Sequence, residues 1–166
     1  MVRKRIVTEL GPLILIADLG ALVYANWDTF DCCKKLKKIE KFLSPSPSLF
    51  DKVIVWQAEQ QILQYLQASR FHFTVPLTFH GTPFQNSVWQ KIREIEYGTF
   101  ISYSRLASAC GKEKGCRAVA SACGANPLAI LVPCHRVRGR KSLGGYTGGI
   151  EKKTFLLNHE NSLKLQ

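Results

Sequence analysis

The sequence predicts a two-domain α/β protein, and three patterns support this prediction. The first half opens with a hairpin pattern, in which the apolar segments Leu13–Ala17 and Ala21–Trp27 flank the turn Asp18-Leu19-Gly20. It continues with segments of helical periodicity and one stretch of period two. The second half contains two short helical segments separated by a tight turn with glycine, which is the outline of a helix-turn-helix. We therefore predict domains at residues 1–79 and 80–166.

Periodicity and stop signals define the other elements of the first half. Leu36, Ile39 and Leu43 share one face of a helix predicted over residues 31–43, and lysines occupy the remaining faces, as on a solvated helix. The stretch 44–48 alternates serine with proline and predicts a loop, after which a longer helix follows over residues 51–67. Residues 71–79 alternate apolar with polar side chains, which predicts a strand, and the proline within it favours an edge position.

Capping residues and glycines divide the second half. Thr82 followed by Pro83 is typical of a helix start, and Phe84, Val88, Trp89 and Ile92 supply its apolar stripe up to Gly98. Glycines end the helices that follow. The predicted elements are a strand at 100–103, helices at 104–110 and 115–123, and a final helix at 150–160.

The apolar run from Asn126 to Val137 contains the residue with the clearest chemical signature. A run of this length predicts a buried strand, and Cys134 lies near its end, next to His135 and Arg136. A neighbouring imidazole and guanidinium favour the thiolate, which is the nucleophilic form of cysteine. We predict that Cys134 is a nucleophile and that the other five cysteines are buried structural residues.

Composition limits the possible partners. A hydrophobic fraction of 46% over 166 residues indicates a globular protein. Lys plus Arg exceed Asp plus Glu by 23 to 12, and the net charge of +11 favours nucleic acid first and an acidic membrane surface second. The basic N-terminus and the apolar stretch after it loosely resemble a secretion signal, but Glu9, Pro12 and Asp18 interrupt that stretch. No apolar run is long enough for a membrane span, and the six cysteines form no zinc-ligand spacing.

Several motifs in order resemble the methylated-DNA–protein-cysteine methyltransferases, also called O6-alkylguanine-DNA alkyltransferases. The resemblance covers residues 79–160 and is carried by short segments in the family's order. These are Thr82-Pro83-Phe84-Gln85, Val88-Trp89, Tyr97-Gly98, Ser102-Tyr103, Arg117-Ala118-Val119, Asn126-Pro127, Pro133-Cys134-His135-Arg136-Val137, Gly144-Gly145-Tyr146-Thr147-Gly148-Gly149 and Leu156-Leu157-Asn158-His159-Glu160.

The resemblance implies a function, a fold and a set of catalytic residues. The family transfers an alkyl group from O6 of guanine in DNA to its own cysteine, once per molecule, without a cofactor. The implied fold is a ribonuclease H-like domain followed by a winged helix-turn-helix domain. The implied catalytic residues are the nucleophile Cys134, His135 with its orienting Glu160, Tyr103 as donor to the leaving base, and Asn126 at the turn before the active site.

The resemblance also implies how DNA is bound. Double-stranded DNA would be held through its minor groove with the damaged nucleotide flipped out, and O4 of thymine is a further possible substrate position. The DNA-contacting residues would be Arg117, which fills the vacated stack, and Ala118, Ala120, Ser104 and Arg136; the substrate pocket would comprise Val137, Tyr146, Thr147 and Pro133. We expect a cytoplasmic monomer without a metal site.

Two positions depart from the family pattern. Ala120 replaces a usual glycine, and its methyl group could hinder close approach of the helix to DNA. Glu96 replaces a usual proline. Three other functions are alternatives: a damage sensor without transfer activity, a cysteine hydrolase, and a sequence-selective DNA-binding regulator. Damage sensors of this kind lack the reactive cysteine, which this chain keeps. A cysteine hydrolase needs an oxyanion hole, for which the sequence gives no specific signal. A sequence-selective regulator conflicts with the minor-groove binding that the resemblance implies.

Overall fold

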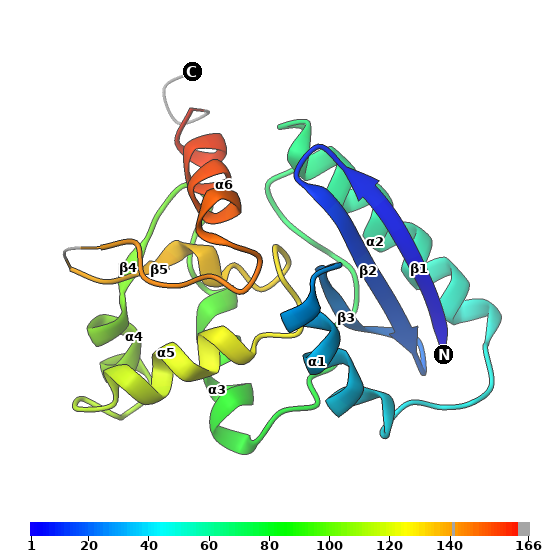
Figure 1. Cartoon of the computed structure of the whole chain (residues 1–166), viewed down its shortest axis with the longest axis horizontal. Coiled ribbons are helices and arrows are strands. Elements are labelled where there is room, and N and C mark those ends of the chain that lie inside the picture. Colours follow the sequence, from blue (N-terminus) through cyan, green and yellow to red (C-terminus); the bar gives the residue numbers. More distant parts are fainter. Residues whose placement is uncertain (141, 163–166) are drawn as a thin grey trace. The chain divides into compact units, whose positions relative to one another are not determined.

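The computed structural model describes residues 1–140 and 142–162. The chain divides into two compact units, coloured by sequence in Figure 1. Unit 1 contains residues 1–80 and the short segment 127–131, and unit 2 contains residues 81–126 and the chain from residue 132 on. The segment 127–131 therefore joins unit 1, although the sequence assigned it to the second domain.

Unit 1 is built on a three-stranded antiparallel sheet in the order β1-β2-β3, with β1 at Val2–Thr8, β2 at Gly11–Asp18 and β3 at Ala21–Trp27. The predicted hairpin is confirmed: Leu19 and Gly20 turn the chain with φ values of 50° and 80°. Strand β1 was not predicted, because its central residues are the exposed, charged Arg3, Lys4 and Arg5.

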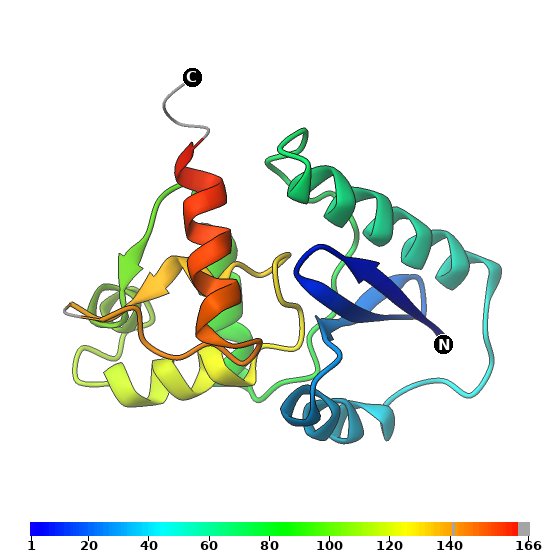
Figure 2. The same cartoon turned by 45° about the horizontal axis from the view of Figure 1, so that its top comes forward.

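Two helices cover the sheet on either side (Figure 2). Helix α1 (Phe30–Glu40) starts at the N-cap Thr29, and its Leu36 and Ile39 pack in one cluster with β2 and β3 residues. Helix α2 (Leu49–Leu66) starts with a capping box between Ser48 and Asp51 and contacts all three strands. Both predicted helices are thus confirmed, within a few residues at each end.

The strand predicted at residues 71–79 is wrong. Only Leu77 forms an isolated bridge, with Leu22, and the Leu22 N–H donates to the Pro76 carbonyl at 2.8 Å. Proline has no N–H, so a continuous ladder cannot pass through residue 76. The alternating pattern still has a structural meaning, since Val75 is buried while its neighbours at 74 and 76 are exposed.

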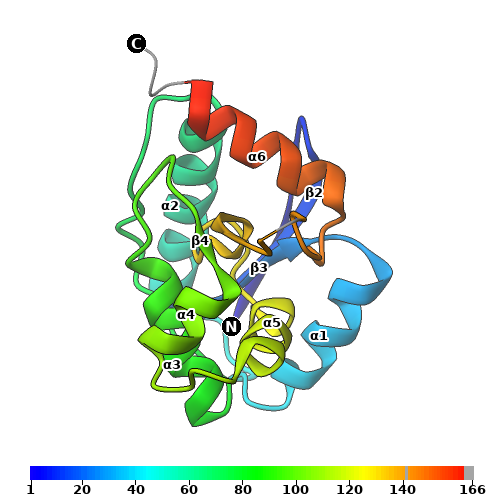
Figure 3. The same ribbon diagram turned by 90° about the vertical axis from the view of Figure 1, so that its left-hand side faces the viewer.

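The described residues of unit 2 form four α-helices and a small parallel pair of strands. Helices α3 (Pro83–Arg93), α4 (Tyr103–Ala109) and α5 (Cys116–Ala125) pack against one another, as Figure 3 shows. The Thr82 capping box with Gln85 confirms the predicted start of α3. Strand β4 (Ile101–Ser102) pairs in parallel with β5 (Val137–Arg138), and α6 (Ile150–Ser162) ends the described chain.

The apolar run before Cys134 is buried but is not a strand, so this prediction is wrong. Leu128 forms one bridge with Ala25, both in unit 1, and Ile130 then has a φ of 72°, which extended strands do not adopt. After a turn, Cys134–Arg136 forms a single 3-10 turn, η1, directly before β5. The nucleophile candidate therefore lies on a buried turn that hydrogen bonds hold in place.

Candidate active site

Cys134 begins the η1 turn with its side chain almost enclosed. The residue is 8% exposed, and the Asn126 side-chain amide donates to its Sγ at 3.2 Å. The same amide donates to the Val132 carbonyl at 2.9 Å, which fixes Asn126 in place. A hydrogen bond donated to sulfur favours the thiolate over the thiol. The structure thus brings the predicted Asn126 and Cys134 into direct contact.

His135 and Glu160 form a buried pair beside this cysteine. The distance from His135 Nε2 to Glu160 Oε1 is 2.8 Å, and the two residues are 0% and 1% exposed. Burial lowers the pKa of His135, although Glu160 opposes that shift. The ring is therefore neutral at pH 7, with its proton on Nε2 facing the carboxylate. The other nitrogen, Nδ1, is buried without a hydrogen-bond partner among the described residues and is left as an acceptor.

Arg136 neutralises Glu160 from the other side. Its Nε and Nη2 donate to the carboxylate at 2.9 Å, and its Nη1 donates to the Ile95 carbonyl at 2.6 Å. The Gly98 N–H also donates to Glu160 Oε2, at 3.1 Å. Burial alone would raise the pKa of Glu160, but its bonds to His135 and Arg136 hold that pKa well below the usual range. Because His135 is neutral, Arg136 supplies the permanent positive charge.

The burial of Arg136 corrects one prediction. The sequence placed this residue among the DNA contacts, but its side chain is 7% exposed and committed to Glu160. A phosphate contact would require breaking that buried ion pair. The sequence signal for the burial of Glu160, the partner of Arg136, was the helical spacing of α6. This spacing puts Leu156 and Glu160 on the inward face of the helix, next to η1.

Tyr103 and the glycine-rich loop lie close together. Tyr103 is the first residue of α4, whereas the sequence placed it at the end of a strand. Burial, together with the charges of Cys123 and Cys134, raises the pKa of Tyr103 to about 12, so its hydroxyl remains a donor. Gly144 has a φ of +70°, and a Cβ added there would meet Tyr103 Oη at 2.7 Å. Only glycine allows this approach.

The predicted pocket residues fall into two groups. Tyr146 presents its ring edge-on to His135, with centroids 6.5 Å apart, and the Thr147 hydroxyl donates to the Gly124 carbonyl at 3.0 Å. Pro133 and Val137 are buried next to η1. The structure therefore places Tyr146 beside the His135–Glu160 pair, and Pro133 and Val137 in the buried surroundings of η1.

Lys153 is a feature of the site that the sequence analysis missed. Its side chain is 0% exposed, and its Nζ donates to the Val137 carbonyl at 2.7 Å and more weakly to the Gly145 carbonyl at 3.4 Å. Burial lowers the pKa of Lys153, and its electrostatic interactions with Cys134 and Cys123 oppose that shift. Its place on the α6 face of Leu156 and Glu160, at helical spacing, could have marked it as an inward-facing residue.

The predicted DNA-contacting residues of α5 lie on one face of that helix. Arg117 and Ala118 are exposed and Ala120 is partly exposed, whereas Val119 and Ala122 are buried on the opposite side. Ser104 is partly buried near the start of α4, with its hydroxyl 2.8 Å from that of Ser102. Among the described residues no group of three or more His, Cys, Asp or Glu could hold a metal ion, and no helix is long and apolar enough to cross a membrane.

Known proteins are similar to this chain in sequence and in fold. Residues 83–162 match the family described as 6-O-methylguanine DNA methyltransferase, DNA binding domain. The chain is 48% identical over 158 residues to the constitutive methylated-DNA–protein-cysteine methyltransferase of Bacillus subtilis, covering 92% of this chain and 91% of that protein. The crystal structure of Mycobacterium tuberculosis OGT in complex with DNA is 34% identical, with a TM-score of 0.80, covering 96% of this chain and 92% of that one.

Some relatives are matched over only part of their length. A probable methylated-DNA–protein-cysteine methyltransferase of Acanthamoeba polyphaga mimivirus is 51% identical over 98 residues, which is 58% of this chain and 66% of that protein. The chain spans 56% of the inducible Bacillus subtilis protein and 30% of the Escherichia coli bifunctional protein Ada.

The fold and the site define a mixed α/β protein of the DNA alkyltransferase class. The chain belongs to the methylated-DNA–protein-cysteine methyltransferase family, which confirms the family predicted from its motifs.

Proposed function

We propose that this protein repairs alkylated DNA by transferring the alkyl group from O6 of guanine to Cys134. The observation that carries the proposal is the contact between Asn126 and the Cys134 sulfur, next to the buried His135–Glu160 pair. In the transfer, a sulfur–carbon bond forms while the carbon–O6 bond breaks, and the electron pair of that bond stays with guanine. The resulting thioether has no good leaving group, so each molecule acts once.

The proton steps follow from the hydrogen bonds of the site. His135 keeps its Nε2 proton toward Glu160, so Nδ1 is free to accept the thiol proton of Cys134, through a bridging water. Glu160 then stabilises the charged imidazole, as the orienting group does in other nucleophile–base–carboxylate arrangements. Tyr103 donates a hydrogen bond to the departing base. The base keeps the electron pair of the broken bond and takes up one proton, and His135 gives up the proton that it received from the thiol, so the products are the thioether and neutral guanine.

DNA binding is proposed for the exposed face of α5 and the start of α4. A guanine in the duplex cannot reach a buried sulfur, so the nucleotide must flip out of the helix. Arg117, which is exposed, would fill the vacated stack, and Ala118, Ala120 and Ser104 would contact the minor-groove backbone. The net charge of +11 supplies affinity for phosphates that does not depend on sequence.

The finer architecture is also part of this proposal. Unit 1, with its antiparallel sheet covered by α1 and α2, supports a ribonuclease H-like domain at residues 1–79. Unit 2, with α4, α5 and the β4–β5 pair, supports a winged helix-turn-helix domain at residues 80–166. All six cysteines lie among the described residues and none of them forms a disulfide, which suits a reduced compartment, and we propose a cytoplasmic monomer.

The variant Cys134→Ala tests the assignment of the nucleophile. It should abolish alkyl transfer from duplex DNA containing O6-methylguanine and keep DNA binding measurable in a mobility-shift titration. Cys116→Ala is the matched control, because Cys116 is a partly exposed cysteine of the same unit, and its transfer should be unchanged. Transfer that persists in Cys134→Ala would rule out Cys134 as the acceptor.

A further inference from the structure

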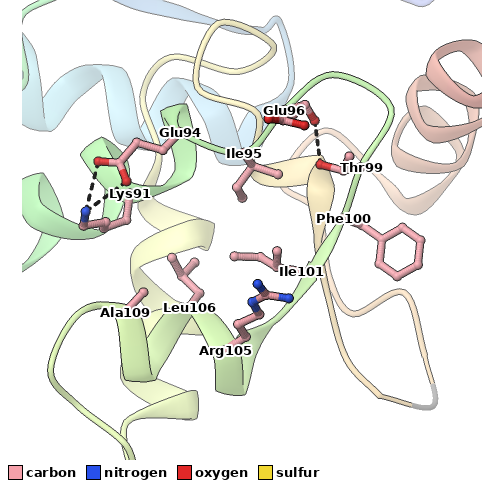
Figure 4. A pocket seen from close by; sticks show the side chains of 10 residues that line it. All are labelled: Lys91, Glu94, Ile95, Glu96, Thr99, Phe100, Ile101, Arg105, Leu106 and Ala109. Atoms are coloured by element: carbon pink, nitrogen blue, oxygen red, sulfur yellow. Dashed lines mark hydrogen bonds and ion pairs between the residues drawn. The ribbon is translucent and has the colours of Figure 1, made fainter. Parts of the chain in front are cut away.

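We propose that unit 2 carries a second binding site, a pocket for a small apolar organic anion, connected to the carboxylate that orients His135. The pocket is separate from Cys134 and lies between the end of α3, the loop before β4, and α4 (Figure 4). Its volume is about 450 Å³, within the range that small ligands occupy in proteins.

The interior of this pocket is apolar. Ile95, Ile101 and Leu106 line it, together with Ala109 at the end of α4. Leu106 is 0% exposed and Ile95 is 7% exposed, so these walls belong to the packed core of the unit. Ile101 is partly exposed and Ala109 is exposed, so a flat hydrocarbon body placed against these two residues would bury apolar surface.

The rim carries two cations and two carboxylates, and the charge at its Arg105 end favours an anion there. Lys91 already donates to both oxygens of Glu94, at 3.1 and 2.9 Å. Arg105 forms no ion pair among the described residues, and Figure 4 shows its side chain pointing from α4 toward Ile101. Glu96 lies at the other end of the pocket in that view. A carboxylate or sulfonate at the Arg105 end would therefore form an ion pair with the Arg105 guanidinium, which pairs with no acidic group among the described residues.

The loop that lines this pocket also holds the catalytic network. The Ile95 side chain lines the pocket, while its carbonyl accepts the 2.6 Å hydrogen bond from Arg136. Three residues further on, the Gly98 N–H donates to Glu160 at 3.1 Å. A ligand that contacts Ile95 thus presses on a segment whose backbone positions both Arg136 and Glu160. Occupation of the pocket should therefore change the amide chemical shift of Gly98, although Gly98 does not line the pocket.

The test uses naphthalene-2-sulfonate as the probe and amide NMR of the full chain. Saturable shifts should appear at Ile95, Ile101, Leu106 and Ala109, with Gly98 shifting in parallel. A probe of this size should bind with a dissociation constant on the order of 1 mM. This readout needs no alkyl transfer, so its result is independent of the proposed function.

Two pairs of variants define the site. Arg105→Ala should weaken probe binding about fivefold, whereas Arg93→Ala, an exposed arginine of α3 outside the pocket, should leave it unchanged. Ala109→Phe should block the pocket, whereas Ser108→Phe, at the neighbouring exposed position, should not. Shifts centred on the exposed apolar residues of α2, which are Leu49, Phe50, Val53 and Trp56, would overturn the site, as would equal binding by all four variants. A Gly98 amide that stays in place at saturation would overturn the connection to Glu160.

Discussion

Replacing Glu160 by glutamine tests the buried network most sharply, because the change keeps the shape and removes the charge. Glu160 is 1% exposed, and Arg136, at 6%, donates three hydrogen bonds to its carboxylate. Removing one partner of a buried ion pair leaves an uncompensated charge and costs about 4 kcal/mol. For a protein of this size, that loss lowers the melting temperature by about 10 °C.

The same change should slow alkyl transfer. A glutamine holds the His135 ring less firmly and stabilises its charged form poorly, so we expect about 100-fold slower transfer from the free base O6-benzylguanine. The assay pairs urea unfolding at pH 7 with the rate of transfer at Cys134. Glu94→Gln is the matched control, since its pair with Lys91 is exposed and worth about 0.5 kcal/mol.

A double variant separates stability from chemistry. Glu160→Gln combined with Arg136→Met removes both charges, and an apolar side chain in place of a buried ion tends to recover stability. The double variant should therefore unfold closer to the wild type while its transfer stays slow. If Glu160→Gln behaved like Glu94→Gln in unfolding, or if the double variant regained the wild-type rate, the reasoning about this network would be refuted.

Three further changes probe the site. Burial lowers the pKa of His135 below its usual 6.5, so the unfolded chain takes up the proton first as the pH falls. The free energy of unfolding should therefore decrease between pH 7 and pH 5. Urea unfolding of His135→Gln should show a smaller decrease. Gly144→Ala should slow transfer at least about tenfold, because its Cβ would meet Tyr103 Oη at 2.7 Å, whereas Gly145→Ala, with open space around it, should not. Arg117→Ala should weaken repair of duplex DNA more than reaction with O6-benzylguanine.

Each of these expectations has an opposing result. An identical pH dependence in His135→Gln and the wild type would assign the acid sensitivity to another group. Equal rates for the two alanine variants of the glycine loop would mean that Tyr103 does not require the close approach of residue 144. Equal losses on duplex DNA and free base would remove the stack-filling role from Arg117.

Sequence patterns predicted the parts of this structure that depend on local chemistry. The helix start at Thr82, the Asp18-Leu19-Gly20 turn and the start of α5 near Gly115 follow from side chains near each other in the chain, whereas Gly124 lies inside α5 and does not end it. The chemical importance of Cys134 was evident because histidine and arginine are its neighbours. The family motifs then indicated Asn126 and Glu160, which the structure places in contact with the cysteine and with its neighbouring histidine.

The features that the sequence did not reveal depend on distant contacts. The run before Cys134 has strand composition, but Ile130 takes a positive φ that no local signal announces. The sequence alone indicated that Arg136 contacts DNA at the surface, whereas in the structure Glu160 of α6 binds its guanidinium. Nothing in the sequence distinguishes Lys153 from the exposed lysines of the chain. In the structure its ammonium group is buried, and the carbonyls of Val137 and Gly145 accept its hydrogen bonds. Composition cannot distinguish a buried cation from an exposed one when its partners are backbone atoms.

The mass of the intact protein after reaction tests the central claim most directly. The protein is incubated with excess duplex DNA containing O6-methylguanine, and the adduct is then located by peptide mapping. The account predicts one methyl group per molecule, on Cys134, with no increase on longer incubation. An unmodified protein that binds the lesion tightly, or a methyl group on another cysteine, would contradict it.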